Sequence, residues 1–307
     1  RYRTALMIGQ VAVACVLTIA AALLLRSFVS VMRVDAGFAP DHLLTWQMNL
    51  PDRLRTADQR RAFYAELFER IEHLPGVQSV GGTTRLPLGS TSVTTTIEIQ
   101  GRPATAAQRP EVEFRRALHR YFETMQIPVR RGRGFTSDDG PAAPPVVVIN
   151  ETMARRLFPA ANPLGQRVRQ DPSGSWLEIV GVVGDVRHSG LEQDPAAEMY
   201  ITYLQNPPVS PFIVVRTDGD PARLAAVLRA EAQRMDPDLP LYDMRTMSDV
   251  RAASVAERRF ILWLVAAFGA IALVLAAIGI DGVVAVAVNE RMPEMSVRLA
   301  LGAAPRQ

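Results

Sequence analysis

Histidine and cysteine are the residue types whose spacing most often indicates catalysis or metal binding, and this chain has few of them. The histidines are His42, His73, His119 and His188, and the single cysteine is Cys15. None belongs to an H-E-x-x-H pattern or to a His/Cys cluster, so the sequence predicts no zinc site. One cysteine cannot form an intramolecular disulfide, and Cys15, inside an apolar run, is expected to pack as a small hydrophobic side chain.

Acidic residues offer little more. Asp185 and His188 are three residues apart in a predicted loop, and that spacing alone is weak support for a metal. Asp138 and Asp139 are adjacent in a glycine-containing loop and are expected to be solvated. We therefore expect no catalytic residue, no metal and no cofactor, and we expect that the chain is not an enzyme.

The basic residues exclude further classes of protein. Every basic residue is an arginine, and without lysine the chain cannot form the phosphate-binding loop of an ordinary P-loop ATPase or a Schiff base. The formal net charge is only +3, and no basic run is interleaved with aromatic residues. The sequence thus gives no indication of nucleic-acid binding.

The sequence contains two long apolar runs, at residues 5–25 and 260–288, that are candidate membrane spans. Residues 5–25 carry no charge, and about 21 helical residues span roughly 31 Å, which matches a hydrocarbon core of about 30 Å. The sequence predicts a first transmembrane helix there. A signal peptide is the competing interpretation, but its apolar region would be about 7–15 residues long.

The second apolar run predicts a transmembrane helix over residues 260–288. Residues 260–280 are uncharged, and Trp263 lies near one end, where an interfacial aromatic residue is expected. Asp281 follows, and the apolar pattern then continues to Val288. Because the preceding residues already span the core, we place Asp281 near the interface, where a carboxylate costs little.

The stretch between these runs, residues 26–259, is polar enough and long enough to form a large water-exposed domain. Two strand–helix–strand units are predicted at its ends, in residues 40–93 and 207–250. In the first, Thr56 and Gln59 form a capping box between strands at 43–50 and 77–83. In the second, Asp220 caps a helix between strands at 212–215 and 241–247.

Residues 94–206 are expected to form an inserted, strand-rich subdomain between the two units. Apolar strands are predicted at 146–149 and 179–183, and Asn150 is expected to cap a short helix. The fold class is therefore a membrane protein with two transmembrane helices flanking a large α+β extracytoplasmic domain, a porter-like split β-α-β module with the insertion.

Several stretches resemble ABC-transporter permeases of the MacB/FtsX type. Residues 290–303 read ERMPEMSVRLALGA and resemble the R-x-x-E-I-G-I-R-x-A-L-G-A segment that follows the second span of these permeases. Pro293 stands where the family usually has a polar or basic residue, and Ser296 replaces the common glycine. Shorter stretches resemble the periplasmic core of the family, in the right order: Gly37-Phe38, residues 74–77, Tyr121-Phe122, residues 132–135 and residues 179–186.

The resemblance implies a periplasmic core domain, cytoplasmic termini and a bacterial inner-membrane location. It also implies a short cytoplasmic coupling helix, here residues 290–304, that docks on a separate ATPase subunit. Glu294, Met295, Arg298 and Leu299 would form that contact. The family further implies a second permease copy or duplicated half as partner. Because its third and fourth spans are missing, we expect that the chain is a fragment.

Other interpretations remain open at this stage. The terminal helix could lie on the membrane surface, as amphipathic segments often do. A two-span membrane receptor with a periplasmic sensing domain would need a signalling coiled coil after Val288, and the sequence there lacks sustained heptads. A membrane-anchored enzyme is the third alternative. For a permease, the substrate is open, and a mechanical role without transport is possible.

Overall fold

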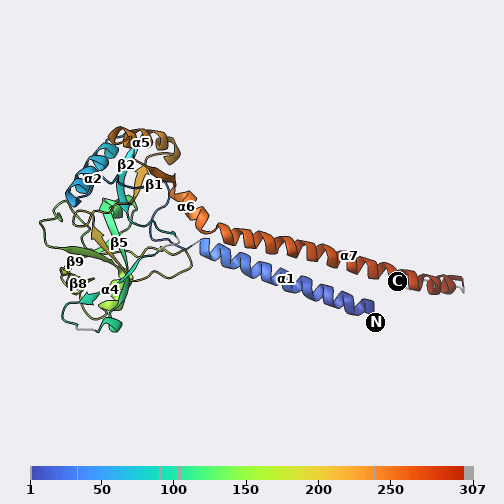
Figure 1. Cartoon of the computed structure of the whole chain (residues 1–307). Coiled ribbons are helices and arrows are strands. Elements are labelled where there is room, and N and C mark those ends of the chain that lie inside the picture. The colour runs from blue at the N-terminus through green and yellow to red at the C-terminus, as the bar shows by residue number, and fades with distance from the viewer. Residues whose placement is uncertain (1, 33, 90–91, 103–104, 238, 301–307) are drawn as a thin grey trace. The chain divides into compact units, whose positions relative to one another are not determined.

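The computed structural model describes residues 2–32, 34–89, 92–102, 105–237 and 239–300, and the chain divides into two compact units. The helical unit comprises residues 1–33 and 255–307, and the domain comprises residues 34–254. In the helical unit, α1 (Tyr2–Met32) and α7 (Ala256–Ala300) lie side by side (Figure 1). All strands and the remaining helices belong to the domain.

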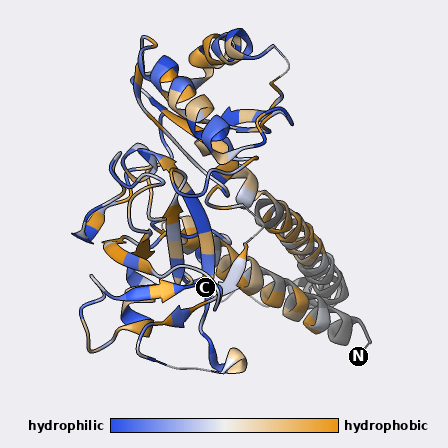
Figure 2. Cartoon of the chain, turned by 60° about the vertical axis from the view of Figure 1, so that its left-hand side comes forward, coloured by the Kyte–Doolittle hydropathy of each residue, from blue (hydrophilic) through white to orange (hydrophobic). Residues whose placement is uncertain are grey.

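Helix α7 contains the stretch Phe260–Gly279, which is long and apolar enough to cross a bilayer. Its large side chains are uncovered: Phe260 is 69% exposed and Trp263 is 71% exposed. Figure 2 shows the hydrophobic colour over much of the coloured part of the long helices. Among the described residues no other helix meets this length, since the apolar stretch of α1 is the shorter Thr18–Met32. The structure thus supports the length and composition of the second predicted span, and the first stays a prediction.

Helix α7 also differs from expectation at its end. It runs without interruption to Ala300, whereas we expected a separate coupling helix over residues 290–304 that begins near Pro293. Pro293 lies inside the helix, where its missing N–H leaves the carbonyl of Asn289 without its usual partner. A proline does not force a new helix when the residues on both sides continue in helical geometry. Residues 301–304 lie outside the described part of the chain.

The domain is built on one mixed sheet of 12 strands in the order β12-β1-β11-β2-β5-β10-β7-β9-β8-β4, with β3 added to β5 and β6 to β9. Two neighbouring pairs, β5 with β10 and β7 with β9, are parallel, and the others are antiparallel. The strand bounds are β1 Leu43–Met48, β2 Val77–Thr83, β3 Thr94–Thr96, β4 Glu98–Ile99, β5 Glu111–His119, β6 Val129–Gly132, β7 Val146–Asn150, β8 Arg167–Arg169, β9 Leu177–Val183, β10 Glu198–Thr202, β11 Phe212–Thr217 and β12 Leu241–Thr246.

The elements of the two predicted strand–helix–strand units are present, and their strands alternate in the sheet in the order β12-β1-β11-β2. The units are β1-α2-β2 and β11-α5-β12, with α2 at Ala57–Glu72 and α5 at Pro221–Met235. Both helices pack against the same hydrophobic cluster, which includes Trp46, Phe68 and Leu228. Every second residue of β1 and β11 belongs to this cluster, namely Leu44, Trp46 and Met48 on β1 and Ile213 and Val215 on β11, which places the cluster on one face of the sheet.

The predicted helix caps are also confirmed. Thr56 and Gln59 form the reciprocal capping box of α2, and the Asp220 carboxylate accepts a hydrogen bond from the N–H of Ala222 at the start of α5. Asn150 caps α4 (Glu151–Leu157), where its Oδ1 accepts from the N–H of Met153 at 2.8 Å. Each cap satisfies a backbone donor that the first helical turn leaves unpaired.

Residues 94–206 do not form a sheet of their own, because β5 joins both parts of the domain. Near its end β5 pairs with β2, and residues Glu113 to Ala117 pair with β10. A second hydrophobic cluster, including Val147, Met153 and Val182, lies under α4 in the part beyond β5. Among the described residues, both hydrophobic clusters therefore lie on one continuous sheet. The sheet is continuous because β5, with nine residues, is long enough to pair with β2 at its end and with β10 along its middle.

Two short helices complete the domain. Helix α3 (Tyr121–Thr124) follows β5, and α6 (Met247–Ser254) follows β12 and precedes α7 in the sequence. Met247 and Val250 of α6 are buried against the domain. The side-chain hydroxyl of Thr246 accepts from the N–H of Asp249, which closes the first turn of α6. The last helix of the domain is thus held at its first turn and along one face.

Candidate functional site

The residues predicted to contact an ATPase subunit lie near the end of α7. The backbone of Glu294, Met295, Arg298 and Leu299 is helical, and their side chains are outside the described part of the chain. Helical spacing places Glu294 one turn from Arg298, and Met295 one turn from Leu299, so the two pairs share neighbouring faces. The contact itself stays a prediction.

Residues 34–42, here called the docking segment, follow α1 in the sequence and are held by several backbone contacts with the domain. Phe38 is buried, the carbonyl of Ala36 accepts from the N–H of Arg187 at 3.0 Å, and the N–H of Ala39 donates to the carbonyl of Met125 at 3.1 Å. The docking segment is therefore built into the domain between the loop after β9 and the end of α3.

Gly37 shows how close this approach is. Its φ is +81°, and a Cβ at this position would lie 1.9 Å from the carbonyl oxygen of Asp185. Only glycine has both the backbone freedom and the small size that this contact needs. The Gly37-Phe38 pair that resembles the family thus marks the point where the docking segment crosses the loop after β9.

Arg216 of β11 fastens the same segment from the sheet. Its Nη2 and Nη1 donate to the carbonyls of Ala39 and Asp41, both at 2.9 Å, and its Nε donates to the carbonyl of Thr124 at 2.8 Å. Arg216 is 6% exposed, and burial lowers its pKa. A guanidinium that donates to three carbonyls from a central strand joins the docking segment, α3 and the sheet. Sequence analysis missed this residue; its signal was a charge inside an apolar strand.

Asp185 and His188, weighed above as a metal pair, have different partners. The Asp185 carboxylate accepts from the N–H and the hydroxyl of Thr152, both at 2.8 Å, at the start of α4. His188 is buried, and its Nε2 lies 3.0 Å from Glu198. Among the described residues no three His, Cys, Asp or Glu side chains are grouped as they would be around a metal ion.

Asp139 corrects an expectation. We expected Asp138 and Asp139 to be solvated, but Asp139 is 3% exposed and receives both Nη1 and Nη2 of Arg133, at 2.6 and 2.8 Å. Burial by itself raises the pKa of Asp139, but the hydrogen bonds from Arg133 and Thr136 outweigh it and leave the pKa below its usual range. The turn is closed by Arg133, the residue directly after β6, and the spacing of the two aspartates alone did not predict this ion pair.

A buried ionic cluster crosses the centre of the sheet. The Nη1 of Arg115 on β5 donates to Glu113 at 2.7 Å and also to Glu198 on β10. The hydroxyl of Tyr200 donates to Glu198 at 2.8 Å, and His188 lies on the same carboxylate. Sequence analysis missed these residues, although charged residues at every second position of an apolar strand were a usable signal.

The electrostatics of this cluster follow from its burial. Burial by itself raises the pKa of Glu198, but the charges of His188 and Arg115 and the hydrogen bonds from His188 and Tyr200 lower it to about 2. Burial and the negative charge of Glu198 raise the pKa of Tyr200. A carboxylate, an imidazole and a phenol could transfer protons, but none of these side chains is more than 5% exposed, so a substrate has no access to them. The cluster therefore joins β5 to β10 by ion pairs inside the sheet.

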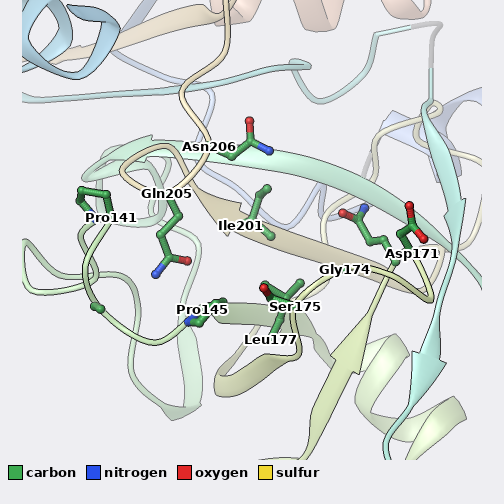
Figure 3. A pocket seen from close by; sticks show the side chains of 11 residues that line it. Pro141, Pro145, Asp171, Gly174, Ser175, Leu177, Ile201, Gln205 and Asn206 are labelled. Atoms are coloured by element: carbon green, nitrogen blue, oxygen red, sulfur yellow. The ribbon is translucent and has the colours of Figure 1, made fainter. Parts of the chain in front are cut away.

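One pocket of about 400 Å³ lies between the loop before β7, the loop before β9 and the segment after β10 (Figure 3). Gln205 forms one wall: its Oε1 accepts from the N–H of Val146 at 3.2 Å, and its Nε2 donates to the carbonyl of Pro144 at 3.0 Å. Asp171 at the rim is held by the N–H and hydroxyl of Ser173, which lower its pKa. These groups can hydrogen-bond a polar ligand, and no histidine lines the pocket to activate Ser175 as a nucleophile.

The chain matches one family over most of the domain. The family model described as the MacB-like periplasmic core domain covers residues 4–232. The chain is 25% identical over 203 residues to the macrolide export ATP-binding/permease protein MacB of Marinobacter nauticus, covering 62% of this chain and 30% of that protein. It is 27% identical over 190 residues to the uncharacterized ABC transporter permease YknZ of Bacillus subtilis, covering 60% of this chain and 47% of that protein.

The chain thus spans less than half the length of either of these relatives. Among solved structures, the periplasmic region of MacB from Actinobacillus actinomycetemcomitans aligns with a TM-score of 0.47 at 17% identity, over 73% of this chain and 97% of that one. The extracellular domain of YknZ from Gram-positive bacteria aligns with a TM-score of 0.43 at 18% identity, over 65% of this chain and all of that one.

Proposed function

This chain belongs to the MacB-like periplasmic core domain family, and on that premise we propose that it is a permease subunit of an ABC transporter. In this proposal α1 and α7 both span the cytoplasmic membrane of a bacterium, the domain lies outside, and the termini are cytoplasmic. The observation that carries the proposal is the family match over residues 4–232, which begins in α1 and ends in α5. The uncovered apolar surface of Phe260–Gly279 supports the membrane location.

The mechanism we propose is mechanical. A separate ATPase subunit closes on ATP, and the helices pass that movement to the domain, for export or for mechanical work outside the cell. Such coupling requires that the connections between the helices and the domain are rigid. The docking segment and α6 are the two connections of the domain to the helices, and both are fastened, by Arg216 and by the buried Met247 and Val250.

The contact with the ATPase is proposed at Glu294, Met295, Arg298 and Leu299. Two charged and two apolar side chains at one-turn spacing make an amphipathic patch that can dock by burial and by ion pairing. A second permease copy, or a duplicated half of a longer chain, would complete the membrane part.

The test is to purify the full-length protein from its native membrane in mild detergent and to identify co-purifying proteins by mass spectrometry. We expect an ATPase subunit with a phosphate-binding loop, and its loss from the Glu294→Ala/Arg298→Ala variant. The matched control is Glu69→Ala/Arg229→Ala, which removes the same two charges from exposed positions of α2 and α5. An ATPase that stays bound to the first variant would refute the contact.

Recovery of the protein without any ATPase, in several detergents, would refute the permease proposal itself. The two-span receptor would then be the better interpretation. ATP hydrolysis by the purified chain with no partner present would contradict both interpretations, because the lysine-free sequence has no phosphate-binding loop.

A further inference from the structure

A second cleft lies on the face of the sheet opposite the Trp46 cluster, between α6 and the loop that follows β2. It has a volume of about 350 Å³. The loop contributes Arg85, Leu86 and Leu88, α6 contributes Val250 and Ala253, and the start and end of two strands contribute Phe212 and Arg245. Its lining thus combines an apolar floor with two arginines and contains no acidic residue.

The two arginines are poorly neutralised by the protein. Among the described residues, the guanidinium of Arg85 has no hydrogen bond or ion pair with another side chain. Arg245 is paired with Asp243 through Nη2 at 2.8 Å, while its Nε is buried and has no partner in the described part of the chain. The local balance of Arg85, Arg245 and Asp243 is therefore one positive charge, with free donors beside apolar side chains.

The loop is held in shape before any ligand binds. Leu88 has φ +61°, a strained backbone conformation that is rare for a large side chain. The conformation persists because the side chains of Leu86 and Leu88 are buried, at 8% and 6% exposed. Thr84, at the base of the loop, donates its N–H to the carbonyl of Arg116 on β5, and its side-chain hydroxyl accepts from the N–H of Arg116. Strain of this kind is typical of preorganised ligand sites.

The covalent chain sets how far this cleft can be from the proposed membrane span. Ser254 lines the cleft, α7 begins at Ala256, and the apolar stretch begins at Phe260. Four helical residues rise about 6 Å, and two extended residues reach about 7 Å, so Ser254 lies at most about 13 Å from the first apolar residue. The headgroup layer of a bilayer adds roughly 5–7 Å on each side of the hydrocarbon core.

We propose that this cleft binds the headgroup of an anionic phospholipid from the outer face of the membrane. The phosphate would accept hydrogen bonds from Arg85 and from the free Nε of Arg245, and the glycerol and first acyl carbons would lie on Phe212 and Leu88. The inference rests on the proposed membrane span, but it requires neither an ATPase partner nor transport. A bound lipid would contact both α6, which precedes α7 in the sequence, and the loop after β2.

The probe is a photoactivatable phosphatidylglycerol, with photoactivatable phosphatidylcholine as the neutral comparison. The full-length protein is reconstituted into nanodiscs of phosphatidylcholine that contain one or the other probe, and labelled peptides are mapped by mass spectrometry. We expect phosphatidylglycerol to label peptides of the loop at residues 84–89 and of α6 several-fold more than phosphatidylcholine. Equal labelling by the two lipids would overturn the proposal.

Three variants sharpen the test. Arg85→Gln/Arg245→Gln should lower labelling by phosphatidylglycerol about fivefold for each arginine, since one cation near an anionic surface is worth about that factor. Ala253→Trp, which fills the cleft and keeps both charges, should abolish the labelling as well. Arg223→Gln, an exposed arginine on α5 whose side chain is 87% exposed, is the matched control and should leave it unchanged. Labelling that survives both cleft variants would refute the site.

Two further outcomes assign the cleft elsewhere and overturn the proposal. Displacement of the lipid by millimolar glycerol phosphate would indicate a site for small anions. Protection of the same peptides by a soluble acidic peptide, without any lipid labelling, would indicate a peptide site. Alkaline extraction of membranes separates this inference from the proposed function: a chain released into the soluble fraction has no span, whereas a retained chain with an unlabelled cleft refutes only the lipid site.

Discussion

Glu113 on β5 and Glu198 on β10 are direct neighbours across two parallel strands, and both carboxylates accept hydrogen bonds from the same nitrogen of Arg115. Two like charges at such positions repel each other and would weaken the pairing of β5 with β10. Arg115 turns this repulsion into attraction at the strand that joins the two parts of the domain.

Replacing Arg115 by methionine should destabilise the protein strongly. The change leaves Glu113 and Glu198 buried side by side without the guanidinium that bridges them, and only His188 remains on Glu198. Breaking a buried ion pair by removing one partner typically costs about 3–5 kcal/mol. Chemical unfolding of the detergent-solubilised protein, followed by fluorescence, measures the loss. The control is Arg116→Met, one residue further along β5, where the guanidinium is partly exposed and stacks on Phe114 at 5.2 Å. Equal losses for both variants would contradict the role of the cluster.

Stability should fall on acidification, with a share that belongs to Glu198. Its folded-state pKa is about 2 against 4.5 for an unperturbed glutamate, so its contribution is complete above pH 4.5 and is lost as the pH falls toward 2. The loss is on the order of 3 kcal/mol for a group that is 1% exposed. Unfolding free energies measured between pH 7 and pH 3 should decrease less steeply for Glu198→Gln. Parallel curves for the two proteins would show that other carboxylates cause the decrease.

Gly37→Ala should cost far more than Gly101→Ala, although both glycines have φ near +80°. At Gly101 an added methyl group meets nothing within 4 Å, so the alanine variant loses stability only through backbone strain, about 1–2 kcal/mol. At Gly37 the methyl group would overlap the carbonyl of Asp185, and the docking segment must move. We expect an additional loss of about 2 kcal/mol or more in chemical unfolding. A difference near zero would mean that the docking segment is not fixed at Gly37.

Arg216→Gln should loosen the docking segment while the sheet stays folded. Three charge-assisted hydrogen bonds are lost, each worth about 1.5–3 kcal/mol in favourable cases, and two of them hold Ala39 and Asp41. Hydrogen–deuterium exchange should rise several-fold in peptides covering residues 36–42 and stay unchanged in β1. Arg223→Gln, at an exposed position of α5, is the control. If exchange at residues 36–42 does not change, Arg216 does not fasten this segment.

Local patterns in the sequence were enough to predict most of the elements of the outer units. Thr56 with Gln59, Asp220 with Pro221 and Asn150 identified three helix starts because capping depends only on residues within one turn. The strand at residues 77–83 was predicted with its observed bounds because Pro75-Gly76 forms a turn directly before it, although α2 already ends at Glu72. The end of α7 was not predicted well, since a proline signals a helix start as readily as it is tolerated inside a continuing helix.

The sequence by itself therefore determined most elements of the two strand–helix–strand units, the apolar run of α7 and the resemblance to the family, because each depends on residues that are near one another in the chain. Only the tertiary structure decided that one sheet runs through the whole domain and that Arg216 holds the docking segment. It also decided that Arg115 bridges the carboxylates of Glu113 and Glu198, which are 85 positions apart in the chain. These features depend on which strands become neighbours. Strand order is set by the packing of distant segments, and no local pattern records it.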